Sequence, residues 1–169
     1  MKKITYLVLT AVTLLIATPA KAQFCWGIKG GVSLGNPADQ PLKLDNYAGF
    51  FIGPKAEARI PVVGLGIEGA VLYAQRFKQD CIQIPVNVKY SFGIGNKANL
   101  FLAVGPEFGF NAGKTDDTYY MTKSSFELNA GLGVTLLKRV QVAANYNMPW
   151  KDKLYYQSGS LQFSLAYLF

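Results

Sequence analysis

Histidine is absent from this 169-residue sequence. Its absence excludes Ser-His-Asp and Cys-His catalytic arrangements and every metal site that depends on an imidazole ligand. Cysteine is limited to Cys25 and Cys81, which we expect at opposite rims of the folded domain. A disulfide requires a short Cα separation, so the sequence predicts two free thiols.

Long hydrophobic runs are also missing once the first 22 residues are set aside. No later window is a continuous apolar stretch of about 18 residues, which argues against a transmembrane helix. Half of the residues are nevertheless hydrophobic. A β-barrel that presents apolar side chains at alternate positions reconciles these two observations.

The start of the chain predicts export. Lys2 and Lys3 precede a mostly apolar stretch, and Ala20-Lys21-Ala22 has the small-x-small pattern of a cleavage site. We therefore expect a signal peptide at 1–22 and a single domain at 23–169. The formal charge of +7 falls when the signal is removed, and no run of Lys or Arg forms a nucleic-acid patch. A nucleic-acid partner is therefore not expected.

The last eleven residues, Gly159 to Phe169, alternate between two kinds of side chain. One face is hydrophobic and ends in Tyr167 and Phe169, whereas the other is small and mostly polar. This is about the length of a tilted strand that crosses a bilayer. The pattern resembles the C-terminal signal of bacterial outer-membrane barrels, which implies that Phe169 and Tyr167 are recognised by the barrel-assembly machinery. An edge strand of a soluble sandwich is the alternative.

Seven earlier segments alternate in the same way and are separated by turn-rich connections. The expected strands run over about 24–34, 46–59, 64–76, 81–93, 98–111, 122–136, 139–148 and 159–169. Long polar connections alternate with tight ones, and aromatic residues gather near both ends of the strands, as they do at the two interfaces of a membrane barrel. The sequence thus predicts an all-β fold: an eight-stranded antiparallel up-and-down transmembrane β-barrel in the outer membrane.

The strand pattern places the charged side chains on the face opposite to the apolar one. The expected inward residues are Lys29, Lys55, Glu57, Arg59, Glu68, Lys89, Glu107, Glu127 and Arg139. An eight-stranded barrel has an interior just wide enough for side chains, and charges removed from water must be paired. If the apolar face pointed inward instead, the chain would be a soluble lipocalin-like carrier, but that face is too bulky to fit.

Turn positions predict the pairing inside this lumen. Lys55 is expected opposite Glu68, and Glu68 opposite Lys89, while Glu107 and Glu127 lie side by side. We predict that these five residues form a luminal charge network. Two adjacent carboxylates can also act as general acid and base, as in glycosidases, but a closed lumen admits no sugar.

Two neighbouring segments carry a family resemblance. Gly66–Gln75, which contains Leu72-Tyr73, is followed by Ile82–Tyr90 with the pattern Ile-Pro-x-x-x-Lys-Tyr. Together with Gly30–Leu34 they resemble the PorT-like outer-membrane β-barrel family over essentially the whole mature chain. The resemblance implies an outer-membrane barrel without catalytic residues or cofactors.

The expected function is therefore that of a small non-catalytic barrel with a closed polar lumen. It would act in membrane integrity or through surface loops, whose aromatic residues and lysines suit outer-membrane lipid, a surface partner or a glycan. The loop residues in question are Tyr119, Tyr120, Trp150, Tyr155, Tyr156, Lys114, Lys151 and Lys153. A narrow ion-conducting channel is the alternative. Asp116-Asp117 could contact calcium, although a solvated turn explains this pair more simply.

Overall fold

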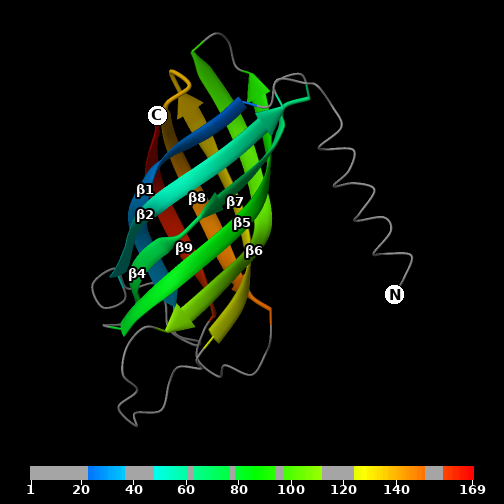
Figure 1. Ribbon diagram of the computed structural model, residues 1–169. Helices are drawn as coiled ribbons and strands as arrows, with labels where there is room; N and C mark the ends of the chain where they lie inside the picture. The colour runs from blue at the N-terminus through cyan, green and yellow to red at the C-terminus, as the bar shows by residue number, and fades with distance from the viewer. Residues whose placement is uncertain are drawn as a thin grey trace, which may run out of the picture.

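The computed structural model describes residues 23–36, 48–60, 63–76, 79–93, 97–111, 124–150 and 158–169, which form antiparallel β-strands (Figure 1). The strands are β1 (Gln23–Asn36), β2 (Ala48–Ile60), β3 (Leu65–Ala70), β4 (Leu72–Arg76), β5 (Gln79–Gly93), β6 (Ala98–Asn111), β7 (Ser124–Leu136), β8 (Val140–Pro149) and β9 (Ser158–Leu168). The expected signal peptide at 1–22, Asp116-Asp117 and all of the expected loop residues except Trp150 lie outside the described residues.

The sheet closes on itself. Its order is β1-β9-β8-β7-β6-β5-β3-β2-β4, with further pairings of β1 with β2 and of β4 with β5. Because β3 and β4 both pair with β2 and β5, they are two halves of one barrel strand. The fold is a closed eight-stranded antiparallel barrel, which confirms the prediction.

The break between β3 and β4 at Val71 results from proline. The register continues unchanged across it, so Val71 lies opposite Pro54 of β2. The Val71 N–H donates to the Pro54 carbonyl at 3.0 Å, but Pro54 has no N–H to donate in return. Pro85 of β5 lies opposite the neighbouring Ala70 on the other side. The hydrogen-bond ladders on both sides of this strand, with β2 and with β5, therefore each lack one backbone N–H donor at neighbouring residues.

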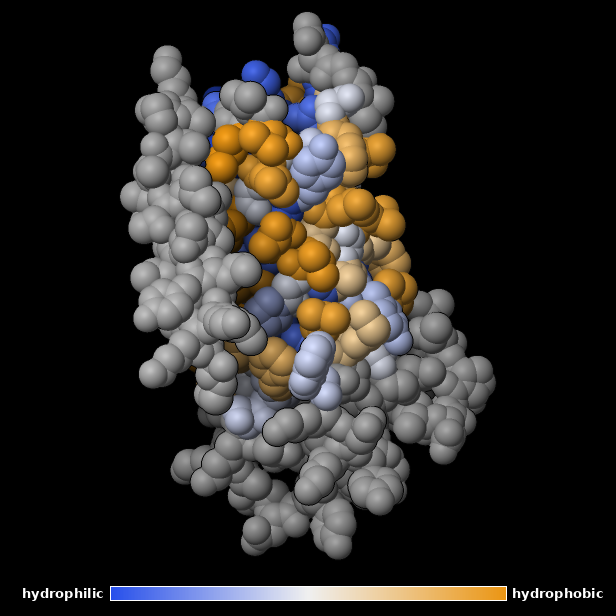
Figure 2. Space-filling view, turned by 90° about the vertical axis from the view of Figure 1, so that its right-hand side faces the viewer, coloured by the Kyte–Doolittle hydropathy of each residue, from blue (hydrophilic) through white to orange (hydrophobic). Residues whose placement is uncertain are grey.

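Apolar side chains face outward and polar ones inward. Val88 is 52% exposed, whereas Lys89, the next residue of β5, is 1% exposed. Figure 2 shows hydrophobic side chains covering the visible flank of the barrel. This arrangement is the reverse of a soluble protein, so the lipocalin-like carrier is wrong. Among the described residues, no helix has the length and apolar character needed to cross a membrane.

The barrel has two distinct ends. One end, the turn end, holds the starts of β1, β3, β6 and β8 and the ends of β2, β5, β7 and β9. The opposite end is the loop end. Ring pairs mark both rims. They are Trp26–Phe169 and Tyr90–Phe92 at the turn end, and Phe50–Tyr73 and Phe108–Phe126 at the loop end. Cys25 lies near the turn end and Cys81 near the loop end, and neither forms a disulfide.

Two hairpin registers differ from the expected ones. Lys55 lies opposite Ala70 rather than Glu68, and Lys89 lies opposite Gly66 rather than Glu68. Each turn is centred one residue from the expected position, and that displacement shifts the register by two. In the first turn Gly64 adopts a φ of 73° and donates its N–H to the Ile60 carbonyl at 3.0 Å, so Gly64 belongs to the turn and β3 begins one residue later than expected.

Gly31 allows β1 and β9 to approach closely at the closing seam. A methyl group at this inward position would overlap the Phe163 carbonyl oxygen and lie 2.6 Å from Cζ of Phe51. We predict that Gly31→Ala lowers the free energy of unfolding by about 1–3 kcal/mol, the usual cost of overpacking. Urea titration of the barrel in detergent, followed by tryptophan fluorescence, measures this change.

Gly30→Ala is the matched control. A methyl group there would point outward and lie 3.4 Å from the nearest atom, the Phe51 carbonyl oxygen, which is nearly ordinary contact. Equal stabilities of the two variants would contradict the close approach at Gly31.

Candidate functional site

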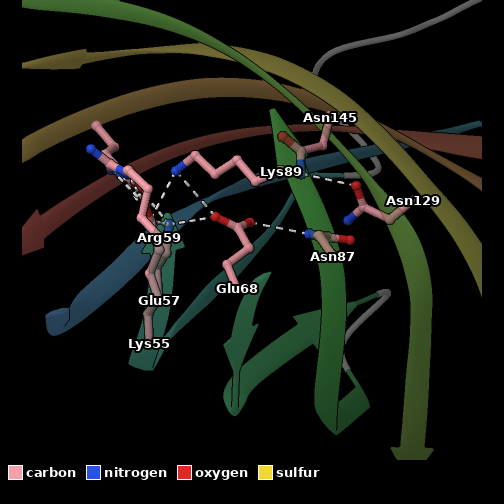
Figure 3. A network of polar contacts seen from close by, with 9 residues as sticks. Lys55, Glu57, Arg59, Glu68, Asn87, Lys89, Asn129 and Asn145 are labelled. Atoms are coloured by element: carbon pink, nitrogen blue, oxygen red, sulfur yellow. Dashed lines mark hydrogen bonds and ion pairs between the residues drawn. The ribbon is translucent and has the colours of Figure 1, made fainter. Parts of the chain in front are cut away.

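Four ions form a closed ring inside the lumen. Lys55 and Glu57 come from β2, Glu68 from β3 and Lys89 from β5, and all four side chains point inward because of the alternation along their strands (Figure 3). Their side chains are at most 7% exposed. Burial at this level is tolerated only when charges are paired.

Cations and anions alternate around this ring, which we call the ion-pair ring. Lys55 Nζ lies 2.8 Å from Glu68 Oε2 and 3.5 Å from Glu57 Oε2. Lys89 Nζ lies 2.9 Å from Glu57 Oε2 and 3.4 Å from Glu68 Oε2. Each ion therefore has two neighbours of opposite charge, and the ring carries no net charge.

Further polar groups saturate the ring. Arg59 Nε donates to Glu57 Oε1 at 3.1 Å, and Asn87 Nδ2 donates to Glu68 Oε1 at 3.1 Å (Figure 3). Lys89 Nζ also lies 3.8 Å from the centre of the Phe101 ring, a cation–π contact. These contacts restrain the carboxylates and ammonium groups within the ring.

The side chain of Gln141 reaches the ring from β8. Its Oε1 accepts a hydrogen bond from Lys55 Nζ, and its Nε2 donates to Glu57 Oε2 at 3.0 Å. The amide thus presents its oxygen to a cation and its nitrogen to an anion. Sequence reasoning missed Gln141 and Phe101 as partners, because no periodicity connects them with charges on distant strands.

Glu107 and Glu127 lie directly opposite each other on β6 and β7. Both carboxylates are buried, and both have interaction partners. Asn129 Nδ2 donates to Glu107 Oε2 at 3.2 Å, and Asn145 Nδ2 donates to Asn129 Oδ1 at 3.0 Å. The ion-pair ring thus brings together three residues of the expected network, whereas Glu107 joins a chain of amides on β7 and β8.

Two other expectations concern the turn end. Arg139 was expected in the lumen, but it is exposed and donates to the Tyr167 hydroxyl at 3.4 Å, because it belongs to the turn between β7 and β8. Phe169 donates its N–H to the Trp26 carbonyl at 2.8 Å, and the two rings lie 4.6 Å apart. Phe169 and Tyr167 thus lie at the seam between β9 and β1.

The described part of the chain contains no group of three or more His, Cys, Asp or Glu residues placed to hold a metal ion. The charged groups of the ring contact one another rather than an open space. This arrangement is suited to filling the barrel.

Comparison with known proteins gives one family and several similar folds. The sequence model of a family described as outer membrane protein beta-barrel domain matches residues 7–169. No curated protein matches the sequence.

Three solved structures share the fold at low sequence identity. Neisserial surface protein A (NspA) has a TM-score of 0.59 and 17% identity, over 86% of this chain and 97% of that one. Ail, the attachment invasion locus protein of Yersinia pestis, has a TM-score of 0.53 and 18% identity, over 88% and 99%. The N-terminal β-barrel domain of Pseudomonas aeruginosa OprF has a TM-score of 0.55 and 12% identity, over 88% and 100%.

Removing one charge from the ring should destabilise the barrel. In Glu68→Gln, Lys55 loses its 2.8 Å partner and Lys89 loses one of its two carboxylates. We predict a loss on the order of 3 kcal/mol in the free energy of unfolding, as for other buried pairs that lose one partner. Urea titration measures it, with Lys138→Gln at an exposed turn position as the control. A loss no larger than that of the control would contradict a structural role for the ring.

Proposed function

The chain belongs to the outer membrane protein β-barrel domain family, and on this premise we propose that it is a non-catalytic barrel with a closed lumen. It resides in the outer membrane of a Gram-negative bacterium. Its role lies in membrane integrity or in contacts made by the connections at the loop end. By the usual orientation of such barrels, the loop end faces outward and the turn end faces the periplasm.

The ion-pair ring is the observation that carries this proposal. An eight-stranded barrel holds little more than its own side chains, and the ring occupies the lumen between β2, β3 and β5. Its charges are satisfied by one another, so a permeating ion would have to separate them. Because the carboxylates and ammonium groups of the ring are held in ion pairs, they are poorly suited to acid–base chemistry. This supports a non-catalytic protein.

Several finer statements belong to the same proposal. We propose that residues 1–22 are a signal peptide and that the chain is a PorT-like barrel, which the pattern around Leu72-Tyr73 and Ile84-Pro85 supports. Phe169 and Tyr167 serve as the signal for the barrel-assembly machinery. Support for this last role comes from the seam, where the terminal aromatic residue contacts β1.

The most specific role that we propose is binding of a surface glycan by the loop end. The Ail structure has also been determined in complex with the heparin analogue sucrose octasulfate, with a TM-score of 0.51 to this chain. Here Trp150 at the loop end is exposed and stacks edge-on against Phe126 at 6.1 Å. Lys151 and Lys153 follow it in the sequence, and a Trp beside lysines suits a sulfated or phosphorylated sugar.

The alternative is a narrow ion-conducting channel, which the polar lining of the lumen favours. Planar-bilayer recording separates the two functions. We predict no discrete conductance steps from the native barrel, because the ion-pair ring fills the lumen. A larger porin in the same bilayer serves as the positive control, and steps from the native chain would favour the channel.

Assembly can be tested through Phe169. We predict that the native barrel in the outer-membrane fraction migrates differently on gels with and without boiling, since a folded barrel resists unfolding without heat. Deletion of Phe169 should weaken this shift, because the N–H donated to Trp26 and the ring contact are both lost.

Phe169→Tyr, which keeps the ring and the backbone N–H, is the control and should retain the shift. A soluble periplasmic protein without any shift would contradict the proposed function. An undiminished shift in the deletion variant would contradict the role of Phe169 alone.

A further inference from the structure

The inward side chains of β7, β8 and β9 differ from those that carry the ion-pair ring. Toward the loop end, next to the buried Glu127 of β7, they are mostly neutral amides and a hydroxyl, here called the amide wall: Asn129, Asn145, Asn147, Ser160 and Gln162. Toward the turn end they include small residues, such as Gly131, Gly133, Ala143 and Ala166. The inward residues of β8 and β9 are therefore uncharged, in contrast to the ion-pair ring on β2, β3 and β5.

Part of the amide wall has no hydrogen-bond partner. Both side-chain polar atoms of Asn147, the hydroxyl of Ser160 and Nε2 of Gln162 are buried and unpartnered. Asn147 is 0% exposed and Gln162 2% exposed. Leaving a buried polar group unsatisfied destabilises the folded state, so four such atoms in one place indicate a ligand that forms the missing hydrogen bonds.

These atoms lie next to one another. Asn147 of β8 is directly opposite Ser160 of β9, and Gln162 is two residues farther along the same face of β9. Gln162 in turn lies opposite Asn145, whose Nδ2 is already engaged by Asn129. The unpartnered atoms thus face the lumen from one continuous patch of two strands.

Their chemistry identifies the class of ligand. The patch offers amide N–H donors, an amide oxygen and a hydroxyl that can both donate and accept. An ion of either sign would satisfy only part of this set, whereas a small neutral molecule that donates and accepts would satisfy all of it. Water is the simplest such molecule, since a buried water typically makes about two to four hydrogen bonds.

Gln141 lies on the same face of β8, nearer the turn end. Its amide crosses to Lys55 and Glu57, whereas Lys55, Glu57, Glu68 and Lys89 contact one another from β2, β3 and β5. Without Gln141, Lys55 would keep Glu68 and Glu57 would keep Lys89. The ring would remain on its own side, and its link to β8 would be lost.

We propose that Asn147, Ser160 and Gln162 form a luminal site for small neutral hydrogen-bonding molecules, water first, and that Gln141 prevents these molecules from passing the ion-pair ring. The inference rests on the proposed closed lumen and names the contact that keeps it closed. It assigns a binding role to the amide wall and a positioning role to Gln141.

Urea permeability of proteoliposomes, measured by stopped-flow light scattering, tests the proposal. The native barrel should be no more permeable than empty liposomes. Gln141→Ala should raise the permeability several-fold, and adding Asn147→Leu to that variant should return it to the native level, because the apolar side chain removes the amide. Gln83→Ala is the matched control: it removes an equally buried glutamine from β5 but leaves Gln141 and the amide wall in place, so this variant should remain closed.

Each outcome has a distinct meaning once every variant shows a boiling-dependent gel shift. A native barrel that already passes urea would overturn the proposed closed lumen itself. A folded Gln141→Ala variant as tight as the native chain would overturn only the role of Gln141. Unchanged permeability on adding Asn147→Leu would overturn the site. If Gln141→Ala does not fold, Gln141→Asn, which keeps the amide but shortens its reach, replaces it.

A measurement on the native chain needs no variant. In nanodiscs, magnetisation transfer from water to the Asn147 side-chain amide should be strong, and transfer to the amide of Asn145, which donates to Asn129, should be weak. Equal transfer to both, or none to Asn147, would contradict bound water at the amide wall.

Discussion

The pairing of β1 with β9 is the constraint on which the rest of the structure depends. Within the hydrocarbon region of a bilayer, no water is available to a peptide group, so every strand needs a neighbour on both sides. The pairing from Gly27–Leu168 to Asn36–Ser158 removes the last free edges. Closure separates an outer face, which must be apolar, from a narrow interior, which must be filled by side chains. The outward Val, Leu and Phe residues and the inward charges follow from this separation.

The interior is filled in two different ways. On β2, β3 and β5, long charged side chains project from the wall and satisfy one another. The inward residues of β7, β8 and β9 are mostly glycine, alanine, serine and amides, which leave space for those side chains. A buried ion pair gains little unless its remaining donors and acceptors are also satisfied. Arg59, Asn87 and Gln141 fulfil that requirement, and Gln141 does so from the opposite side of the lumen.

Much of this architecture could be predicted from the sequence, because a strand has a period of two residues. The strand segments, the faces of the strand residues and the positions of the aromatic rims follow from that period, whereas Arg139, expected at the start of a strand, lies in a turn. Register depends instead on turn geometry, and both misplaced turns shifted it by two residues. Such a shift keeps each residue on its own face, so Lys55, Glu68 and Lys89 remain luminal although their opposite residues change. The break at Val71 could not be predicted, because the effect of Pro54 depends on which residue lies opposite. Gln141 is 86 residues from Lys55, and only closure of the barrel brings the two together.

The ion-pair ring also has a consequence for insertion into the membrane. Its four residues lie within one stretch of chain, from Lys55 to Lys89, on barrel strands that are consecutive in sequence. The ring is electrically neutral and uses no residue of β1 or β9. These hairpins can therefore neutralise their charges before the seam forms. Carrying an unpaired charge into hydrocarbon costs several kcal/mol. Pairing within these hairpins therefore lowers the free-energy barrier to insertion of the chain.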